Sequence, residues 1–384
     1  MTAFEFATAS RIIFGRGTAQ QGGAAAVAIG RRALLVCGRT PARAAGVHAS
    51  LEAAGLAVTA WPTAGEPYID DITRGVAAAR DAACDVVVAV GGGSALDTGK
   101  AIAAIAANGG DVLDYLEVIG AGRALARPAL PVVAVPTTAG TGSEVTRNAV
   151  LASREHRVKV SLRSPHMLPR VAIVDPELTV TLPAAATATT GLDALTQLIE
   201  PFVSARANPM TDALCAAGIA RAAAALPRAW RDGTDIDART DMALASLWSG
   251  MALANAGLGA VHGLAGPLGG MFEAPHGALC AALLPHVMAG NIAALRRRSQ
   301  APALARFDEV ARLLTGRPGA VADDGVRLVT DLCVEFSVPR LAHYGITAAH
   351  VADVVPHAQR ASSMKGNPVE LTAAELEELL SAAL

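Results

Sequence analysis

Three side chains of metal-binding types, Asp193, His262 and His276, lie in alanine-rich stretches that should fold as helices. Carboxylate and imidazole groups suit Zn²⁺ or Fe²⁺, and three protein ligands leave a coordination position open for a substrate. Gln197 follows Asp193 by four residues, which places both on one helix face, although an amide oxygen is a weaker ligand than imidazole. Ligands from different helices have no tight spacing, so the two histidines fit buried, hydrogen-bonded core positions equally well.

A glycine-rich run, GGGSALDTGK at residues 91–100, follows the apolar strand expected at Asp85–Val90 and precedes helical Ala101–Ala107. Glycines let the backbone approach a phosphate, and free N–H groups at a helix start donate hydrogen bonds to it. The run has neither the GxGxxG nor the GxxxxGK[ST] spacing. A pyrophosphate site is therefore favoured by its place after a buried strand, and a plain tight turn is the alternative.

A second polar loop, PTTAGTGSE at residues 136–144, leaves the strand expected at Pro131–Val135. Ligands bind outside the carboxyl ends of strands in parallel sheets, where hydroxyls and small residues are useful. The alternative is a turn in which Thr141 or Ser143 caps a helix. Two such loops together favour a dinucleotide site.

The elements that must position these groups differ between the two halves of the chain. Up to about residue 182, short apolar runs alternate with helical stretches, one of them at Ile72–Ala83, which is typical of a parallel sheet covered on both faces. After it, almost every segment is expected to be helical. We therefore expect a dinucleotide-binding α/β domain at residues 1–182 and a helical metal and substrate domain at residues 183–384. The remaining expected strands are Ala33–Cys37, Ala57–Trp61 and Val171–Val174.

Composition and charge argue against several classes of protein. The net charge is −2 and no basic block is present, which argues against nucleic acid as a partner. Apolar stretches are broken well short of the roughly 20 residues that a membrane span needs, and the first residues do not resemble a signal peptide. The 5 cysteines form no CxxC pair and are expected to be reduced core thiols of a cytoplasmic protein.

Lysine is rare in this chain, because 29 of its cationic residues are arginine. Lys100 and Lys159 are therefore candidates for positions that need a compact ammonium group, with retention by chance as the alternative.

With these motifs identified, the chain resembles the iron-containing (group III) alcohol dehydrogenase family over nearly its whole length. The resemblance implies a Rossmann-like domain, a helical metal domain, a homodimer, and NAD- or NADP-linked interconversion of an alcohol and a small aldehyde or ketone. Besides the two loops, it rests on IFGRG from Ile13, VAIVDPEL from Val171, GLDALTQLIEPFVS from Gly191, VHGLAGPLGG from Val261 and APHG from Ala274.

The resemblance also assigns roles to individual residues. It places Gly92, Gly93 and Ser94 at the pyrophosphate, and it implies that Asp193, His262 and His276 are catalytic metal ligands. The further cofactor positions that it implies are Gly38, Asp97, Thr137, Thr138, Lys159 and Leu178.

Two departures from the family pattern bear on the metal, Fe²⁺ or Zn²⁺. Gln197 stands where the family has a fourth ligand, usually His, and Gly266 stands where many members carry a proton-relaying His. Asp-His-His without the fourth His resembles the zinc set of glycerol dehydrogenase, whereas the related maleylacetate reductases work without a metal. The alternatives are such a metal-free reductase, a lyase similar to dehydroquinate synthase, and a nucleotide-binding protein without catalysis.

The residues after the strand at Ala33–Cys37 bear on the choice of cofactor. NAD-using members often carry an Asp there to hold the ribose diol, whereas this chain has Arg39 and Arg43. Arginine can pair with the 2′-phosphate of NADP and no carboxylate repels it, so NADP is favoured over NAD. The alternative is that both arginines are surface side chains.

Overall fold

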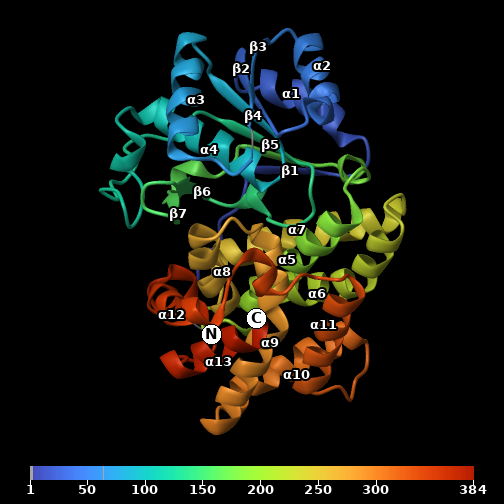
Figure 1. Ribbon diagram of the computed structural model, residues 1–384. Coiled ribbons are helices and arrows are strands. Elements are labelled where there is room, and N and C mark those ends of the chain that lie inside the picture. The colour runs from blue at the N-terminus through green and yellow to red at the C-terminus, as the bar shows by residue number, and fades with distance from the viewer. Residues whose placement is uncertain (1–2, 64) are drawn as a thin grey trace. The chain divides into compact units, whose positions relative to one another are not determined.

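The computed structural model describes residues 3–63 and 65–384, which form two compact units (Figure 1). One unit comprises Ala7–Thr138 and Gly142–Thr181. The other comprises residues 3–6, Ala139–Thr141 and Leu182–Leu384. The first is built on a parallel sheet and the second is all-helical, which confirms the predicted fold class.

The α/β unit contains a six-stranded parallel sheet with the strand order β1-β8-β5-β4-β2-β3. Each strand predicted from an apolar run is present to within one or two residues. The strands are β1 Arg11–Phe14, β2 Arg32–Cys37, β3 Ala57–Pro62, β4 Val86–Gly91, β5 Val132–Pro136 and β8 Val171–Val174.

Helices cover both faces of this sheet, because successive residues of a strand point to opposite sides. On β2, Leu34 and Val36 pack in the same core cluster as residues of α3 (Ile69–Asp81) and α4 (Gly93–Asn108). On the other face, Leu35 packs with residues of α2 (Ala45–Ala53) and of α1 (Gly22–Val27). Apolar side chains on both faces explain why the strands read as continuous hydrophobic runs.

The helix expected at Ile72–Ala83 begins earlier and ends earlier, at Ile69–Asp81. Asp71 lies in the first turn, and its carboxylate accepts a hydrogen bond from the backbone N–H of Tyr68 at 3.1 Å. Such a carboxylate satisfies a free donor and is favoured by the helix dipole. At the other end Ala83 has a φ of 49°, which a continuing helix does not allow.

The sequence patterns did not predict β1 or the antiparallel hairpin of β6 (Asn148–Ser153) and β7 (Val158–Arg163). β1 is a four-residue strand at the edge of the sheet that pairs with β8, about 160 residues later in the chain. Both hairpin strands carry polar residues among the apolar ones, which makes their hydrophobic runs short. A partner far away in the sequence defines β1, whereas β6 and β7 pair with each other and differ from the predicted strands in their interrupted apolar pattern.

Close helix packing builds the all-helical unit. Gly191 and Gly218 allow α5 and α6 to approach, because a Cβ on Gly191 would lie 2.2 Å from Leu226 and one on Gly218 2.6 Å from Leu198. The helices are α5 Ala184–Val203, α6 Pro209–Arg231, α7 Ile236–Ala256, α8 Ala260–Met271, α9 His276–Arg297, α10 Ala301–Thr315, α11 Ala322–Glu335, α12 Val351–Arg360 and α13 Ala373–Ala383.

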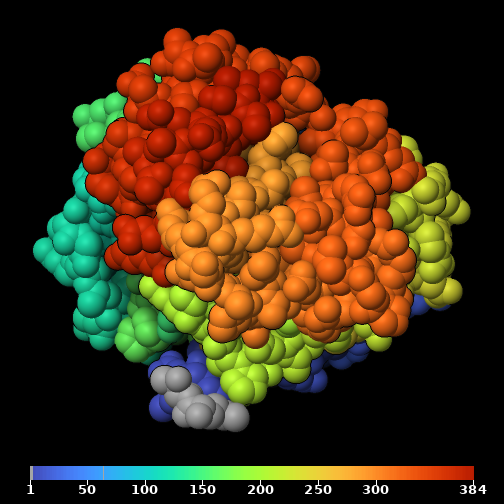
Figure 2. Space-filling view, turned by 90° about the horizontal axis from the view of Figure 1, so that it is seen from below, coloured from blue at the N-terminus to red at the C-terminus, as the bar shows by residue number. Residues whose placement is uncertain are grey.

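Helix α9 is central to this unit and contacts α5, α8, α10, α11 and α13. Its C-terminal end emerges between the α10–α11 pair and the segment after residue 340 (Figure 2). Within the described residues, α9 is the single helix long and apolar enough to cross a membrane, and 78% of that stretch is buried inside the protein. The prediction that the apolar stretches are too short for a membrane span does not hold for the length and composition of α9.

Candidate metal centre and cofactor loops

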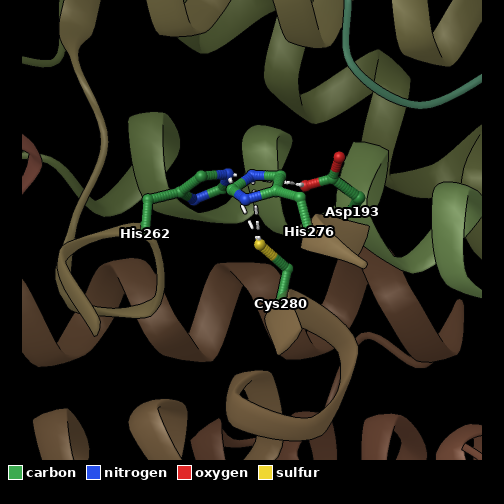
Figure 3. A group of neighbouring side chains, drawn as sticks. All are labelled: Asp193, His262, His276 and Cys280. Carbon is green, nitrogen blue, oxygen red and sulfur yellow. Dashed lines mark hydrogen bonds and ion pairs between the residues drawn. The ribbon is translucent and has the colours of Figure 1, made fainter. Parts of the chain in front are cut away.

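Four metal-binding side chains meet in the helical unit: Asp193 from α5, His262 from α8, and His276 and Cys280 from α9 (Figure 3). One ligand atom from each lies within 4.8 Å of the corresponding atoms of the other three. His262 Nε2 lies 3.4 Å from Asp193 Oδ1, and His276 Nε2 lies 3.9 Å from it. The structure thus brings together three of the four residues predicted for the metal set, Asp193, His262 and His276, and it adds a cysteine; the fourth, Gln197, is not in this group.

Asp193 has the burial and the unpaired carboxylate oxygen that are expected of a metal ligand. Its residue exposure is 2%, and its Oδ1 atom has no hydrogen-bond partner among the described residues. Leaving a buried carboxylate oxygen unpaired is costly unless a cation or proton occupies the space that it faces. Burial raises the pKa of Asp193, but His262, His276 and Gln197 outweigh burial and lower it. The donor set therefore fits a divalent metal ion.

Glu200 orients one of the imidazoles. It lies on α5 seven residues after Asp193, and its Oε2 is 2.6 Å from His262 Nδ1 while its Oε1 accepts a hydrogen bond from Val261 N at 2.7 Å. A carboxylate on one ring nitrogen fixes the tautomer, so that the other nitrogen is free to bind a metal. Burial opposes protonation, but Cys280, Glu200 and Asp193 raise the pKa of His262 well above its ordinary value. Glu200 was not predicted as a site residue, although its seven-residue spacing from Asp193 puts it on the same helix face.

We expect Glu200→Gln to weaken metal binding by roughly 10- to 100-fold, as is typical when a histidine ligand loses its carboxylate partner. The amide can still accept the Val261 N–H, so the fold should be retained. Dissociation constants measured by competition with a chromophoric chelator test this. Equal affinities in the variant and the wild type would show that Glu200 does not hold His262 for the metal.

Gln197 lies beside the cluster and is 3% exposed. Its Oε1 accepts a hydrogen bond from Ser249 Oγ at 3.1 Å, and its side chain is also hydrogen-bonded to Asp193. Both polar ends of the amide are therefore engaged by protein groups.

His276 is the accessible member of the group. Its side chain is 38% exposed, whereas those of His262 and Asp193 are 6% and 3% exposed. A small molecule would therefore reach the cluster past the first residue of α9.

In the α/β unit, both predicted loops lie at the carboxyl ends of neighbouring strands. β4 ends at Gly91, where glycine is required because φ is 157° and a Cβ would lie only 2.6 Å from Ala95. Gly92 then caps α4, so the first N–H groups of that helix face the loop. Thr137 N donates to Gly91 O at 2.9 Å, and a Cβ on Gly92 would touch Thr138 at 3.4 Å. The two loops therefore form one continuous surface of glycines, hydroxyls and helix N–H groups.

The other predicted cofactor residues divide into two groups: Gly38 and Leu178 lie at the edge of the sheet that carries the loops, whereas Lys159 and Asp97 are paired with protein side chains. Gly38 donates its N–H to Val90 O at 3.2 Å and adjoins the glycine loop, and Leu178 lies in the short helix Pro176–Thr179 after β8, at the same edge of the sheet. Lys159 forms an ion pair with Glu66 at 2.6 Å. Asp97 accepts hydrogen bonds from Ser143 Oγ at 2.6 Å and Val150 N at 2.9 Å.

Asp97 belongs to a buried polar cluster around Lys100, whose side chain is fully buried. Lys100 Nζ lies 3.1 Å from Asp97 Oδ1 and donates hydrogen bonds to Ser143 O at 2.9 Å, to Thr146 Oγ1 at 3.0 Å and to Asn148 O. The ammonium thus fixes the segment between the second loop and β6 to helix α4. This explains a lysine at this position in an arginine-rich chain, because a guanidinium is larger and planar.

Glu144, in the same segment, is 2% exposed. Burial raises its pKa to about 7, although its own backbone N–H and Lys100 act in the opposite direction. A raised pKa means that the folded protein favours the protonated carboxyl, so stability from this group is present at low pH and lost as the pH rises towards 7.

We therefore expect Glu144→Gln to raise the free energy of unfolding at pH 8, relative to the wild type, by on the order of 2 kcal/mol. Near pH 4 both side chains are neutral in both states, and the two proteins should be equally stable. Urea unfolding at the two pH values measures the difference. A gain of the same size at both pH values would contradict a buried, titrating carboxyl.

Known proteins can now be compared with this fold and site. The family model of the iron-containing alcohol dehydrogenases matches residues 9–176, and that of the C-terminal domain of the Fe-containing alcohol dehydrogenase family matches residues 187–384. Alcohol dehydrogenase 4 of Saccharomyces cerevisiae is 38% identical over 88% of this chain and 86% of its own length. The NAD-dependent methanol dehydrogenase of Bacillus methanolicus is 34% identical over 100% of both chains. The crystal structure of a 1,3-propanediol oxidoreductase, 33% identical, superposes with a TM-score of 0.93 over 100% of both chains. Matches in both halves, at this identity and coverage, show that the chain belongs to the iron-containing alcohol dehydrogenase family.

Proposed function

We propose that this enzyme interconverts an alcohol and a small aldehyde or ketone by metal-assisted hydride transfer with NAD or NADP. The observation that carries the proposal is the buried Asp193 oxygen without a hydrogen-bond partner among the described residues, facing the Nε2 atoms of His262 and His276. Family membership supports the same reaction and favours it over a lyase or a non-catalytic protein. We assign dinucleotide binding to residues 1–182 and metal and substrate binding to residues 183–384.

Asp193, His262 and His276 would hold the ion, Fe²⁺ or Zn²⁺, with Gln197 close by. The bound metal supplies Lewis-acid polarisation of the carbonyl oxygen. Glu200 keeps the lone pair of His262 Nε2 directed at the metal position. The half-exposed side of His276 admits the substrate.

When bound, the reduced cofactor would supply a hydride for the carbonyl carbon, and the carbonyl oxygen would need a proton. The family's relay position holds Gly266, where an added Cβ would meet open space. Glycine has no proton to give, so a water molecule or a ribose hydroxyl of the cofactor delivers it.

The two loops provide the cofactor contacts in this proposal. Gly92, Gly93 and Ser94 at the start of α4 would bind the pyrophosphate through backbone N–H groups. The contacts assigned to the rest of the dinucleotide are Gly38, Asp97, Thr137, Thr138, Lys159 and Leu178.

The carboxyl end of β2 supports NADP as the preferred form. Arg39 is exposed there, and Arg43 is partly buried and donates a hydrogen bond to Thr181 O at 3.0 Å. No carboxylate occurs among residues 37–43 to repel a 2′-phosphate.

Turnover of an aldehyde panel with NADPH and NADH tests both the reaction and the cofactor. We expect a higher kcat/KM with NADPH, and we expect Arg39→Ala to lower it by about tenfold, because a charge-assisted hydrogen bond contributes about 1.5 kcal/mol. The NADH value should change little. No turnover of any carbonyl despite bound cofactor would overturn the dehydrogenase proposal, and equal losses with both cofactors would overturn the role of Arg39.

We further propose that the enzyme acts in the cytoplasm as a homodimer. All five cysteines are free, which suits a reducing compartment. The homodimer rests on the family's tendency, and light scattering of the purified protein measures it directly.

A further inference from the structure

We propose that Cys280 is the fourth protein ligand of the metal centre, so that Asp193, His262, His276 and Cys280 form a donor set that shifts metal preference from iron towards zinc. This inference rests on the metal site of the proposed function. It assigns the fourth coordination position, for which Gln197 would be a weak ligand, to a residue from a different helix.

The separations of the donor atoms fit one tetrahedral ion. Metal–ligand bonds of about 2.0–2.1 Å to N or O and about 2.3 Å to S put neighbouring donors about 3.3–3.5 Å apart. Cys280 Sγ lies 3.6 Å from His276 Nε2 and 3.8 Å from His262 Nε2, and Asp193 Oδ1 lies 3.4 Å from His262 Nε2. His276 Nε2 lies further from Asp193 Oδ1, at 3.9 Å, and all four donor atoms lie within 4.8 Å of one another, so the donors must move together by roughly 0.5–1 Å to complete the coordination shell. Figure 3 shows the sulfur and both imidazoles directed towards one another.

The polar atoms that face the space between the four donor side chains favour a bound cation. In the neutral ring that a metal ion requires, the proton lies on Nδ1 beside Glu200, and Nε2 is then an acceptor. The facing Asp193 Oδ1 is an acceptor too, is buried, and has no hydrogen-bond partner within the described part of the chain. Two acceptors 3.4 Å apart repel each other unless a positive charge lies between them.

A purely structural role explains Cys280 less well. Its residue exposure is 0%, and its sulfur lies between two imidazole nitrogens at nearly equal distances. A thiol has one proton and can donate to only one of them. A thiolate bound to a metal ion explains why the sulfur lies near both imidazole nitrogens. The thiol proton would leave to solvent as the sulfur–metal bond forms.

Helix geometry also favours Cys280 over Gln197. Cys280 follows His276 by four residues on α9, so both side chains project from one face of a rigid helix. The amide of Gln197 is engaged by Ser249 and Asp193, which makes it a group that positions the carboxylate. Thiolate is the softer donor, and softer donors favour zinc.

Cobalt substitution of the full-length protein tests the inference without using activity. Metal-free protein is titrated with Co²⁺, the bound metal is counted, and the near-ultraviolet sulfur-to-cobalt charge-transfer band is recorded. We expect one ion per chain and a clear band in the wild type. The band should be lost in Cys280→Ser and Cys280→Ala and kept in Gln197→Ala. Cys333→Ser is the matched control, because that thiol donates to Ala281 O beside the site and lies outside the donor cluster.

Zinc affinity gives a second readout. Removing a direct ligand should weaken Zn²⁺ binding by more than the roughly 100-fold upper range for an outer partner. The ratio of zinc to iron bound anaerobically from an equimolar mixture should fall from the wild type to Cys280→Ser. Any nitrogen–oxygen site already prefers zinc to iron, so the change in the ratio, not its value, is diagnostic.

The outcomes separate this inference from the proposed function. Stoichiometric Co²⁺ without a charge-transfer band overturns ligation by Cys280 and leaves the metal-assisted reaction intact. A band that survives in both Cys280 variants overturns it as well. No metal bound by the wild type overturns the metal site itself, and with it this inference. The wild-type spectrum decides even if the variants fold poorly.

Discussion

Asp193→Ala should yield an enzyme that retains no metal and reduces aldehydes at least about 10³-fold more slowly in kcat/KM. Loss of a Lewis acid removes several kcal/mol of transition-state stabilisation, and about 4 kcal/mol corresponds to that factor. Asp193 is the single carboxylate among the clustered donor side chains, so its removal also removes charge compensation for the ion. Steady-state kinetics and metal content on the same preparation measure both effects.

The loss should be chemical and not structural. Asp193 Oδ1 has no hydrogen-bond partner among the described residues, although truncation also removes the hydrogen bond between Asp193 and Gln197, so the alanine variant should lose only about 1 kcal/mol relative to wild type stripped of metal. Asp331→Ala, an exposed position on α11, is the matched control and should leave metal content and rate unchanged. Full activity in a metal-free Asp193→Ala protein would exclude the metal-assisted reaction and leave a metal-independent reductase.

Lys100→Met should destabilise the protein by about 3–5 kcal/mol, because it leaves the other members of a buried ionic network without their partner. The substitution removes hydrogen bonds to Ser143 O, Thr146 Oγ1 and Asn148 O and strands the largely buried carboxylate of Asp97. For a unit of this size the midpoint of thermal unfolding should fall by about 10 °C. Calorimetry measures it.

A matched control is an exposed ion pair in the same unit. Arg74 and Asp71 are paired at 2.5 Å with side chains 66% and 38% exposed. Arg74→Met should cost no more than about 1 kcal/mol. A comparable loss in both variants would mean that the Lys100 cluster has no special contribution.

The sheet could be predicted because burial on both faces makes its central strands continuous apolar runs, as in Val86–Gly91. The edge strand β1 could not be predicted because its partner β8 lies about 160 residues later, and the β6–β7 hairpin could not because polar residues interrupt its short apolar runs. Helix α3 begins three residues earlier than predicted, because the carboxylate of Asp71 satisfies a backbone donor in its first turn that no hydrophobic pattern reports.

The candidate site, like the fold, could be predicted from the sequence only in part. Family motifs identified Asp193, His262 and His276, and the structure places them in one cluster. Cys280 was counted as one of five scattered core thiols, since its four-residue spacing from His276 carries weight only when both side chains face the same partner. Three of the five cysteines are indeed buried, whereas Cys84 and Cys333 are only partly so.

The donor atoms come from α5, α8 and α9; a short loop joins α8 to α9, whereas α6 and α7 lie between α5 and α8 in the chain. An ion bound to all three acts as a cross-link that the unfolded chain lacks, so binding energy becomes resistance to unfolding that grows with metal concentration above the dissociation constant. Opening of these helices, as seen by amide hydrogen exchange, would then be coupled to release of the ion. In a cell, metal supply would set how long each enzyme molecule survives proteolysis as well as how fast it works.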